Sequence, residues 1–224
     1  MADGVILDND VLIKASCYSI SEELIDILSA FGGANVVGVT RYIVEKQIQR
    51  SSRVIDKISA NSEFKKLLAS LTDIEPTEAE ILLAAELETH ALEKNLHIDS
   101  GESQILAIAL YRTAMMMVTG DKRAIGGIEP VLEAIGKSGL CDGRVVCLEQ
   151  IIMSVLSRLS AEDLQKKVCR EIHADKTLTL VFSCKSCSPV DENNAKDGLA
   201  SYIRHVRASA PSALFPLDEL SVAS

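Results

Sequence analysis

Two apolar segments of the sequence end in aspartate. Asp8 follows the run Val5 to Leu7 in VILDND, and Asp121 follows the run that begins MMMVTGDKRA. In doubly wound parallel sheets, ligands bind outside the carboxyl ends of the strands, so both acids would lie at one edge if their strands are neighbours. Either aspartate alone is equally compatible with a helix N-cap or a turn. As a pair they suggest one acidic site.

Glu102 extends this acidic pattern. In the predicted helix GESQILAIAL it precedes Ile105, Leu106 and Ala109 by three, four and seven residues, which places it along the buried face. A lone buried carboxylate is costly, so it would take up a proton or pair with a cation. The alternative is a capping box, in which Glu102 bonds back to the amide of Asp99.

Two further acids are candidates on weaker grounds. Glu45 is expected early in a helix, beside an apolar stripe formed by Val44, Ile48, Ile55 and Ile58, where a solvated glutamate is the simpler interpretation. Asp10 follows Asp8 by two residues, and strand-like spacing would make both side chains face the same way. Asp10 would then add a ligand or hold a metal-bound water.

Carboxylates gathered in this way need a cation. Two unit charges about 4 Å apart repel each other by roughly 4 kcal/mol at an effective dielectric constant of about 20. An all-oxygen set of ligands selects hard ions such as Mg²⁺ or Mn²⁺. The predicted metal ligands are Asp8, Asp10, Glu102 and Asp121.

The elements that must position these acids predict an α/β protein with a mostly parallel central sheet flanked by helices. In the 224-residue chain, apolar β-type runs alternate with helical periodicity. Strands are predicted at Val5–Leu7, Val36–Val39, Met115–Thr119 and Arg144–Leu148. Helices are predicted at Ser21–Ala30, Thr40–Ala60, Thr77–Lys94, Gly101–Arg112 and Ile128–Gly136, with Gly32-Gly33 and Gly126-Gly127 as breaks.

The alternation is complete by Leu148, which predicts one domain over residues 1–150 and a small C-terminal α+β extension over residues 151–224. In the extension, LSAEDLQKKV begins with a capping pattern of Ser160 and Asp163. TLTLVFSC is expected to form a strand and AKDGLASYIRHV a helix. The role of the extension does not follow from its sequence.

From about Gly4 to Gln150 the chain resembles a PIN-domain nuclease. The resemblance rests on the order and spacing of VILDNDVLI, VVGVTRYIVEKQI, DSGESQILAIAL and MMMVTGDKRAI. It implies that Asp8, Glu45, Glu102 and Asp121 are catalytic in a Mg²⁺- or Mn²⁺-dependent nuclease. Asp10 departs from the family pattern, where asparagine is common at that position.

The family resemblance also implies a substrate and partners. RNA is the more frequent substrate than DNA, and many members act as toxins, so a homodimer and an inhibitory partner protein are both open. The expected mechanism is hydrolysis of a phosphodiester by water that a carboxylate-bound metal acidifies. Lys122 or Arg123 would stabilise the charge that develops in the transition state.

Two other functions are alternatives. The run DND followed by Val-Leu also resembles phosphatases of the haloacid dehalogenase type, with Asp8 as nucleophile, Asp10 as general acid, and Thr40 and Lys94 in supporting roles. That family requires an acid where this chain has Ile125, and it leaves Glu102 without a role. The third alternative is a non-catalytic binding module on the same fold, for which a broken acidic set would be the sign.

Nucleic-acid binding would depend on a local cluster of cations, because the net charge of −9 repels phosphates at long range. On the predicted helix Thr40–Ala60 a cationic stripe opposite the apolar one is formed by Lys46, Arg50, Arg53 and Lys57. It would be either a solvated face or a row of phosphate contacts, with Lys122 and Arg123 near Asp121 adding to it.

The six cysteines are too scattered for a dense disulfide framework and are expected to be thiols. A zinc site formed by Cys169, His173, Cys184 and Cys187 is a minor alternative, because its spacing is not a familiar signature. No apolar run approaches the roughly 18 to 20 residues that span a bilayer, and the N-terminus is acidic, so a cytoplasmic protein without membrane contact is expected.

Overall fold

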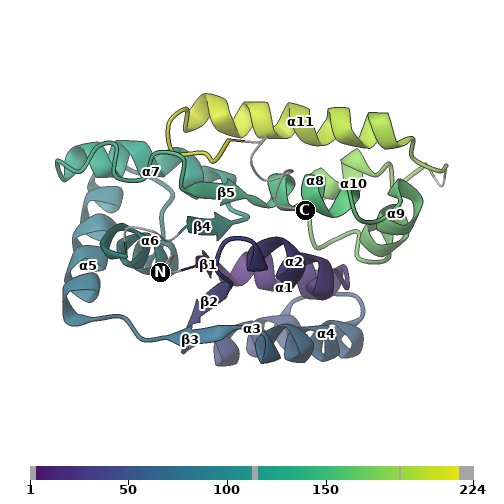
Figure 1. Ribbon diagram of the computed structural model, residues 1–224, viewed down its shortest axis with the longest axis horizontal. Helices are drawn as coiled ribbons and strands as arrows, with labels where there is room; N and C mark the ends of the chain where they lie inside the picture. Colours follow the sequence, from purple (N-terminus) through teal and green to yellow (C-terminus); the bar gives the residue numbers. More distant parts are fainter. Residues whose placement is uncertain (1–3, 113–115, 187, 217–224) are drawn as a thin grey trace.

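The computed structural model describes residues 4–112, 116–186 and 188–216, and it confirms the α/β class. A parallel sheet with the strand order β3-β2-β1-β4-β5 forms the centre of the molecule (Figure 1). Its strands are β1 (Val5–Leu7), β2 (Ala34–Val37), β3 (Thr72–Ile74), β4 (Met116–Thr119) and β5 (Val145–Cys147).

Strand β1 lies between β2 and β4, so the carboxyl ends of β1 and β4 are neighbours. Val5 pairs with Ala34 on one side and with Met116 on the other, and Leu7 pairs with Val118. The chain builds the sheet outward from β1 first through β2 and β3 and then through β4 and β5. The expectation that the strands before Asp8 and Asp121 are adjacent is confirmed.

Helices cover both faces of the sheet (Figure 1). They are α1 (Asn9–Cys17), α2 (Ser21–Ser29), α3 (Thr40–Arg50), α4 (Lys57–Ala69), α5 (Glu78–Glu93), α6 (Ser100–Tyr111), α7 (Lys122–Ala134), α8 (Leu148–Leu156), α9 (Ala161–Arg170), α10 (Lys176–Val181) and α11 (Glu192–Ser209). One apolar core involves α1 to α4 and α8 to α10, and the other involves α5 to α7. Helix α11 joins the two, because Leu199 is buried in the first core and Ile203 in the second.

The predicted helix Thr40–Ala60 is wrong, because the chain leaves the helix at Ser51. The Ser51 hydroxyl accepts a hydrogen bond from the amide of Arg53 (3.1 Å), an interaction that competes with continued helix. Asp56 then starts a new helix by accepting from the amide of Ser59 (2.9 Å). The break turns Val54 inward, whereas Ile55 is 54% exposed instead of joining the apolar stripe.

Gly126 and Gly127 do not break the chain but lie inside α7, which begins at Lys122. A Cβ atom on Gly127 would lie 3.0 Å from Ile98 Cγ1, and one on Gly126 would lie 3.4 Å from the Ser209 side chain. These glycines therefore allow close packing of α7 against its neighbours. Among the other elements, β3, α1 and α8 have no counterpart in the sequence prediction. Strand β3 is only three residues long, and α1 and α8 start directly after β1 and β5 with hardly any loop to mark them.

The C-terminal extension is helical where a strand was predicted. TLTLVFSC falls in α10 and the turn after it, because Asp175 caps α10 by accepting from the amide of Leu178 (3.0 Å). The predicted cap at Ser160 is confirmed by its hydrogen bond from the amide of Asp163 (3.1 Å). The predicted boundary at residue 150 falls inside α8, which packs against α2 and α11.

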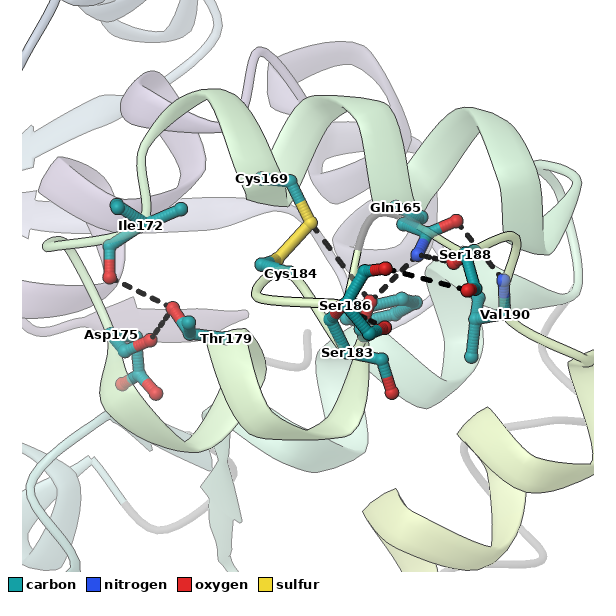
Figure 2. The surroundings of a disulfide bond; sticks show 11 residues. Gln165, Cys169, Ile172, Asp175, Thr179, Ser183, Cys184, Ser186, Ser188 and Val190 are labelled. Carbon is teal, nitrogen blue, oxygen red and sulfur yellow. Dashed lines mark hydrogen bonds between the residues drawn. A yellow bond between two sulfur atoms is a disulfide. The ribbon is translucent and has the colours of Figure 1, made fainter.

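The cysteines of the extension contradict the zinc interpretation and the expectation of thiols throughout. Cys169 of α9 and Cys184 after α10 form a disulfide (Figure 2), so their sulfurs are bonded to each other. His173 is exposed, and Cys187 lies outside the described residues. Three cysteines are free and buried, namely Cys17, Cys141 and Cys147. In the described part of the chain, no helix is long and apolar enough to cross a membrane.

Glu171 fastens the extension to the turn between α3 and α4. Its carboxylate is 3% exposed and accepts hydrogen bonds from the amides of Ile55 and Asp56, both at 2.7 Å. We expect Glu171→Ala to lower the free energy of unfolding by about 2 kcal/mol or more, since two amides lose a charged acceptor. Urea unfolding followed by circular dichroism measures this, with Glu162→Ala, an exposed glutamate of α9, as the control. Equal midpoints for both variants would contradict the fastening role.

Candidate functional site

Asp8 stands at the carboxyl end of β1, at the N-cap position of α1. Its side chain makes no capping hydrogen bond and instead accepts a hydrogen bond from Thr119 Oγ1 to Oδ2 (2.9 Å). Thr119 is fully buried at the end of β4, and its Oγ1 also accepts a hydrogen bond from the amide of Asp121 (3.2 Å). The simple capping interpretation of Asp8 is therefore wrong, and Thr119 links the ends of the two strands.

Glu102 lies at the start of α6 and is 8% exposed, as the helical spacing predicted. It takes part in the capping box that was the alternative interpretation. Glu102 Oε2 accepts from the amide of Asp99 (2.9 Å), and Asp99 Oδ1 accepts from the amide of Glu102 (2.9 Å). The capping box and the buried position coexist, because the cap uses Oε2 and holds the carboxylate on the inner side of the helix.

Asp121 caps α7 at the carboxyl end of β4. Its Oδ1 accepts from the amides of Arg123 (2.8 Å) and Ala124 (3.3 Å), and its Oδ2 lies 3.3 Å from the guanidinium of Arg123. Burial raises the pKa of Asp121, but the hydrogen bonds from Arg123 outweigh it, so that the pKa is lowered. The surroundings of Asp121 therefore favour its charged form.

Burial and mutual repulsion act on the other two acids. Burial raises the pKa of Glu102 to about 8, with a capping bond opposing and the charges of Asp99, Asp121 and Asp8 adding to the rise. Burial likewise raises the pKa of Asp8 to about 6; the Thr119 bond opposes this, and Asp10 and Asp99 add to it. These acids therefore lie close enough to influence one another. We define the acidic cluster as Asp8, Asp99, Glu102 and Asp121.

Asp10 does not stand in line with Asp8, because helix α1 already begins at Asn9. Its carboxylate pairs with Lys14 one helical turn later, with Oδ2 2.7 Å from Nζ. The pair packs over the turn after β4, where a Cβ on Gly120 would lie 2.1 Å from Asp10 Oδ2. Asp10 thus borders the acidic cluster, with its charge already balanced by a buried cation.

The cations predicted for phosphate binding are distributed differently from the expected stripe. Lys46 and Arg50 are exposed on α3, Arg53 lies in the turn after it, and Lys57 starts α4 and donates to the Gln49 carbonyl (2.8 Å). The helix break therefore divides the stripe, which is a correction of the sequence analysis. Beside Asp121, the side chain of Lys122 points to the C-terminal extension, and Arg123 pairs with Asp121 itself.

Glu45 lies half-buried on α3, and among the described contacts it has no hydrogen bond or ion pair with the acidic cluster. The residues of the phosphatase alternative are also dispersed. Lys94 is exposed at the end of α5, Thr40 is buried at the start of α3, and Asp10 is paired with Lys14. The structure brings together Asp8, Glu102 and Asp121 of the predicted site, with Asp10 at its border.

The oxygen donors suit a hard divalent cation, but their present arrangement is not a formed metal site. Among the described residues, no three His, Cys, Asp or Glu side chains converge on a point where a metal could lie. Hydrogen bonds now use Oε2 of Glu102 and Oδ2 of Asp8, so a cation would take the other oxygen of each. The raised pKa values of both acids are the physical sign that a cation would be favourable there.

Sequence analysis missed the residues that hold the predicted site residues in place. Thr119, Lys14, Asp175 and Thr177 each contact a predicted site residue or a neighbour of one. Of the residues around the site, only Asp99 could have been found from the sequence, because its capping box with Glu102 is a recognisable pattern. Comparisons of the sequence with models of protein families, with curated proteins and with solved structures found no match.

Proposed function

We propose that the protein is a Mg²⁺- or Mn²⁺-dependent nuclease that hydrolyses phosphodiester bonds, with RNA the more favoured substrate. The observation that carries the proposal is the acidic cluster at the adjacent ends of β1 and β4, where burial and repulsion raise the pKa values of Asp8 and Glu102. Structural carboxylates seldom gather in this way without a cation, and such perturbed groups concentrate at functional sites.

The residues of the chain have separate roles in this proposal. Asp8, Glu102 and Asp121 would hold the metal, and when bound it would neutralise the phosphate and acidify the attacking water. Thr119 orients Asp8 through the hydrogen bond to Oδ2, and the capping box orients Glu102. Without a metal the raised pKa of Glu102 favours its protonated form at neutral pH, so binding of a cation there would require loss of this proton. Arg123 is the cation nearest Asp121 for the transition state.

The test is incubation of the full chain with single-stranded and duplex RNA and DNA, in Mn²⁺, Mg²⁺ or EDTA. We expect cleavage of single-stranded RNA in Mn²⁺ and no cleavage in EDTA. Release of inorganic phosphate from a phosphomonoester, with no strand cleavage, would favour the phosphatase alternative. Binding of nucleic acid without any cleavage in either metal would favour the non-catalytic module.

A further inference from the structure

Lys14 is a cation buried next to the acidic cluster. Its side chain is 10% exposed, and its ammonium lies 2.7 Å from Asp10 Oδ2 and 2.8 Å from Asp175 Oδ2. Asp10 belongs to the same helix, but Asp175 comes from the C-terminal extension, at the start of α10. The second partner of Lys14 is therefore supplied by a distant part of the chain.

Lys122 follows Asp121 directly and is likewise held from the extension. Its ammonium donates to Thr177 Oγ1 (2.6 Å) and lies 2.6 Å from Glu149 Oε1 and 5.2 Å from the centre of the Tyr202 ring. Burial raises the pKa of Asp175, but attraction from Lys14 and, to a smaller extent, from Lys122 outweighs it, so that the pKa is lowered. Asp175 therefore interacts electrostatically with both lysines.

Asp175 and Thr177 lie in a loop of the chain that is closed by a disulfide. The disulfide joins Cys169 to Cys184, 15 residues later, and α10 lies between the two cysteines (Figure 2). The side chain of Gln165 on α9 fixes the segment after α10, because its amide group donates to the carbonyls of Phe182 and Ser188, both at 2.8 Å. We call residues 169–184 the strap.

We propose that Lys14 and Lys122 form a binding site for a backbone phosphate of single-stranded nucleic acid, and that Asp175 of the strap occupies this site as an intrachain substitute. The proposal rests on the nuclease function for the identity of the ligand. The site lies beside the acidic cluster, because Lys14 faces the turn at Gly120 and Lys122 adjoins Asp121. A phosphate bound there would place the adjacent phosphate of the same nucleic-acid strand near Asp8 and Glu102.

The exchange would leave the net charge around the two lysines unchanged. The carboxylate of Asp175 carries one negative charge, and so does a phosphodiester, so replacing one by the other leaves each lysine with its remaining acid. These acids are Asp10 for Lys14 and Glu149 for Lys122. The Thr177 hydroxyl that accepts a hydrogen bond from Lys122 is uncharged. A charged phosphate oxygen that replaced this hydroxyl would accept a stronger hydrogen bond from the same ammonium.

The experiment measures binding of a fluorescein-labelled single-stranded RNA of mixed sequence to the full chain in EDTA, by fluorescence anisotropy. We expect Asp175→Asn to lower Kd by about tenfold, the scale of one charge-assisted hydrogen bond. Asparagine can still cap α10, so the helix should persist. The salt dependence should steepen, by about 0.7 in the log-log slope for each further phosphate that the lysines neutralise. DNA of the same sequence should compete, whereas equimolar inorganic phosphate should not.

The matched control is Asp191→Asn. Asp191 also caps a helix of the extension, through the amides of Asn193 and Asn194, but it is exposed, and none of its described contacts is with a lysine. Its Kd should equal that of the wild type. Adding Lys14→Gln and Lys122→Gln to Asp175→Asn should abolish the increase in affinity. If Asp175→Asn does not fold, Thr177→Val provides the second test, because it removes the hydrogen bond between the strap and Lys122 without removing a charge.

Unchanged affinity in folded Asp175→Asn and in Thr177→Val would overturn the proposal, even if the protein cuts RNA. Conversely, tighter binding without any metal-dependent cleavage would support the lysine site while removing the nuclease function.

Reduction of the disulfide is a second experiment. A dithiol gives two electrons and two protons to the disulfide, yielding two cysteine thiols and a cyclic disulfide of the reagent. If the disulfide holds Asp175 against Lys14, reduction should lower Kd, and an unchanged Kd in fully reduced protein would show that the disulfide has no part in occupying the site.

Discussion

Replacement of Asp8 by asparagine is expected to lower Mn²⁺-dependent cleavage of RNA by at least about 100-fold. Changes in residues that only support metal ligands typically cost about 10- to 100-fold in affinity or activity, so loss of a ligand should cost at least as much. Glu102→Gln and Asp121→Asn should have effects of the same size. Single-turnover cleavage rates of the three purified variants, at saturating Mn²⁺, measure the loss.

Asparagine and glutamine separate chemistry from structure at these positions. Asp8 makes no capping hydrogen bond and its charge is disfavoured by burial, so Asp8→Asn should not lower the melting temperature in EDTA. Asp121→Asn can still cap α7 and loses only the exposed pair with Arg123, so the protein should remain folded. The control is Asp73→Asn, an exposed aspartate that pairs with Arg41 away from the acidic cluster. It should cut RNA at the wild-type rate. Folded Asp8→Asn or Glu102→Gln protein with wild-type cleavage would show that the cluster does not perform the reaction.

The parts of the site that could be predicted are those set by local patterns. Asp8 and Asp121 follow apolar runs, and the rule that parallel strands share their carboxyl edge brings them together. Glu102 follows from helical periodicity, which places its side chain on the buried face of α6. In each case the nearest few residues carry the information.

The parts that could not be predicted depend on contacts between distant residues or on side-chain competition with the backbone. Lys14 and Asp175 are far apart in the sequence, and nothing near either of them indicates the ion pair. The end of α3 depends on the hydroxyl of Ser51, although the residues after it keep a helical pattern. Cys169 and Cys184 were both candidate ligands of a possible zinc site, and their spacing did not indicate that they form a disulfide with each other.

The pH dependence of stability without metal should be large and should have an uncommon sign. The pKa of Glu102 is raised to about 8 and that of Asp8 to about 6, whereas both would titrate near their usual values of 4.5 and 3.8 in the unfolded chain. Between these limits the folded protein holds protons that the unfolded chain has released. Stability therefore falls as pH rises, by about 1.4 kcal/mol per pH unit for each fully linked proton. Melting temperature in EDTA should decrease from pH 5 to pH 8.

Two controls assign this slope to the acidic cluster. Glu102→Gln removes the group with the higher pKa, so its melting temperature should change little between pH 6.5 and pH 8. The lowered pKa values of Asp121 and Asp175 act with the opposite sign, because their stabilisation is lost only as pH falls below the usual range of aspartate. Mn²⁺ favours the charged carboxylates and should raise the melting temperature more at pH 8 than at pH 5, because fewer protons have to leave at the higher pH. A melting temperature in EDTA that stays level or rises from pH 5 to pH 8 would mean that burial and the neighbouring carboxylates do not raise the pKa values of Asp8 and Glu102, and the case for a cation at the acidic cluster would be lost.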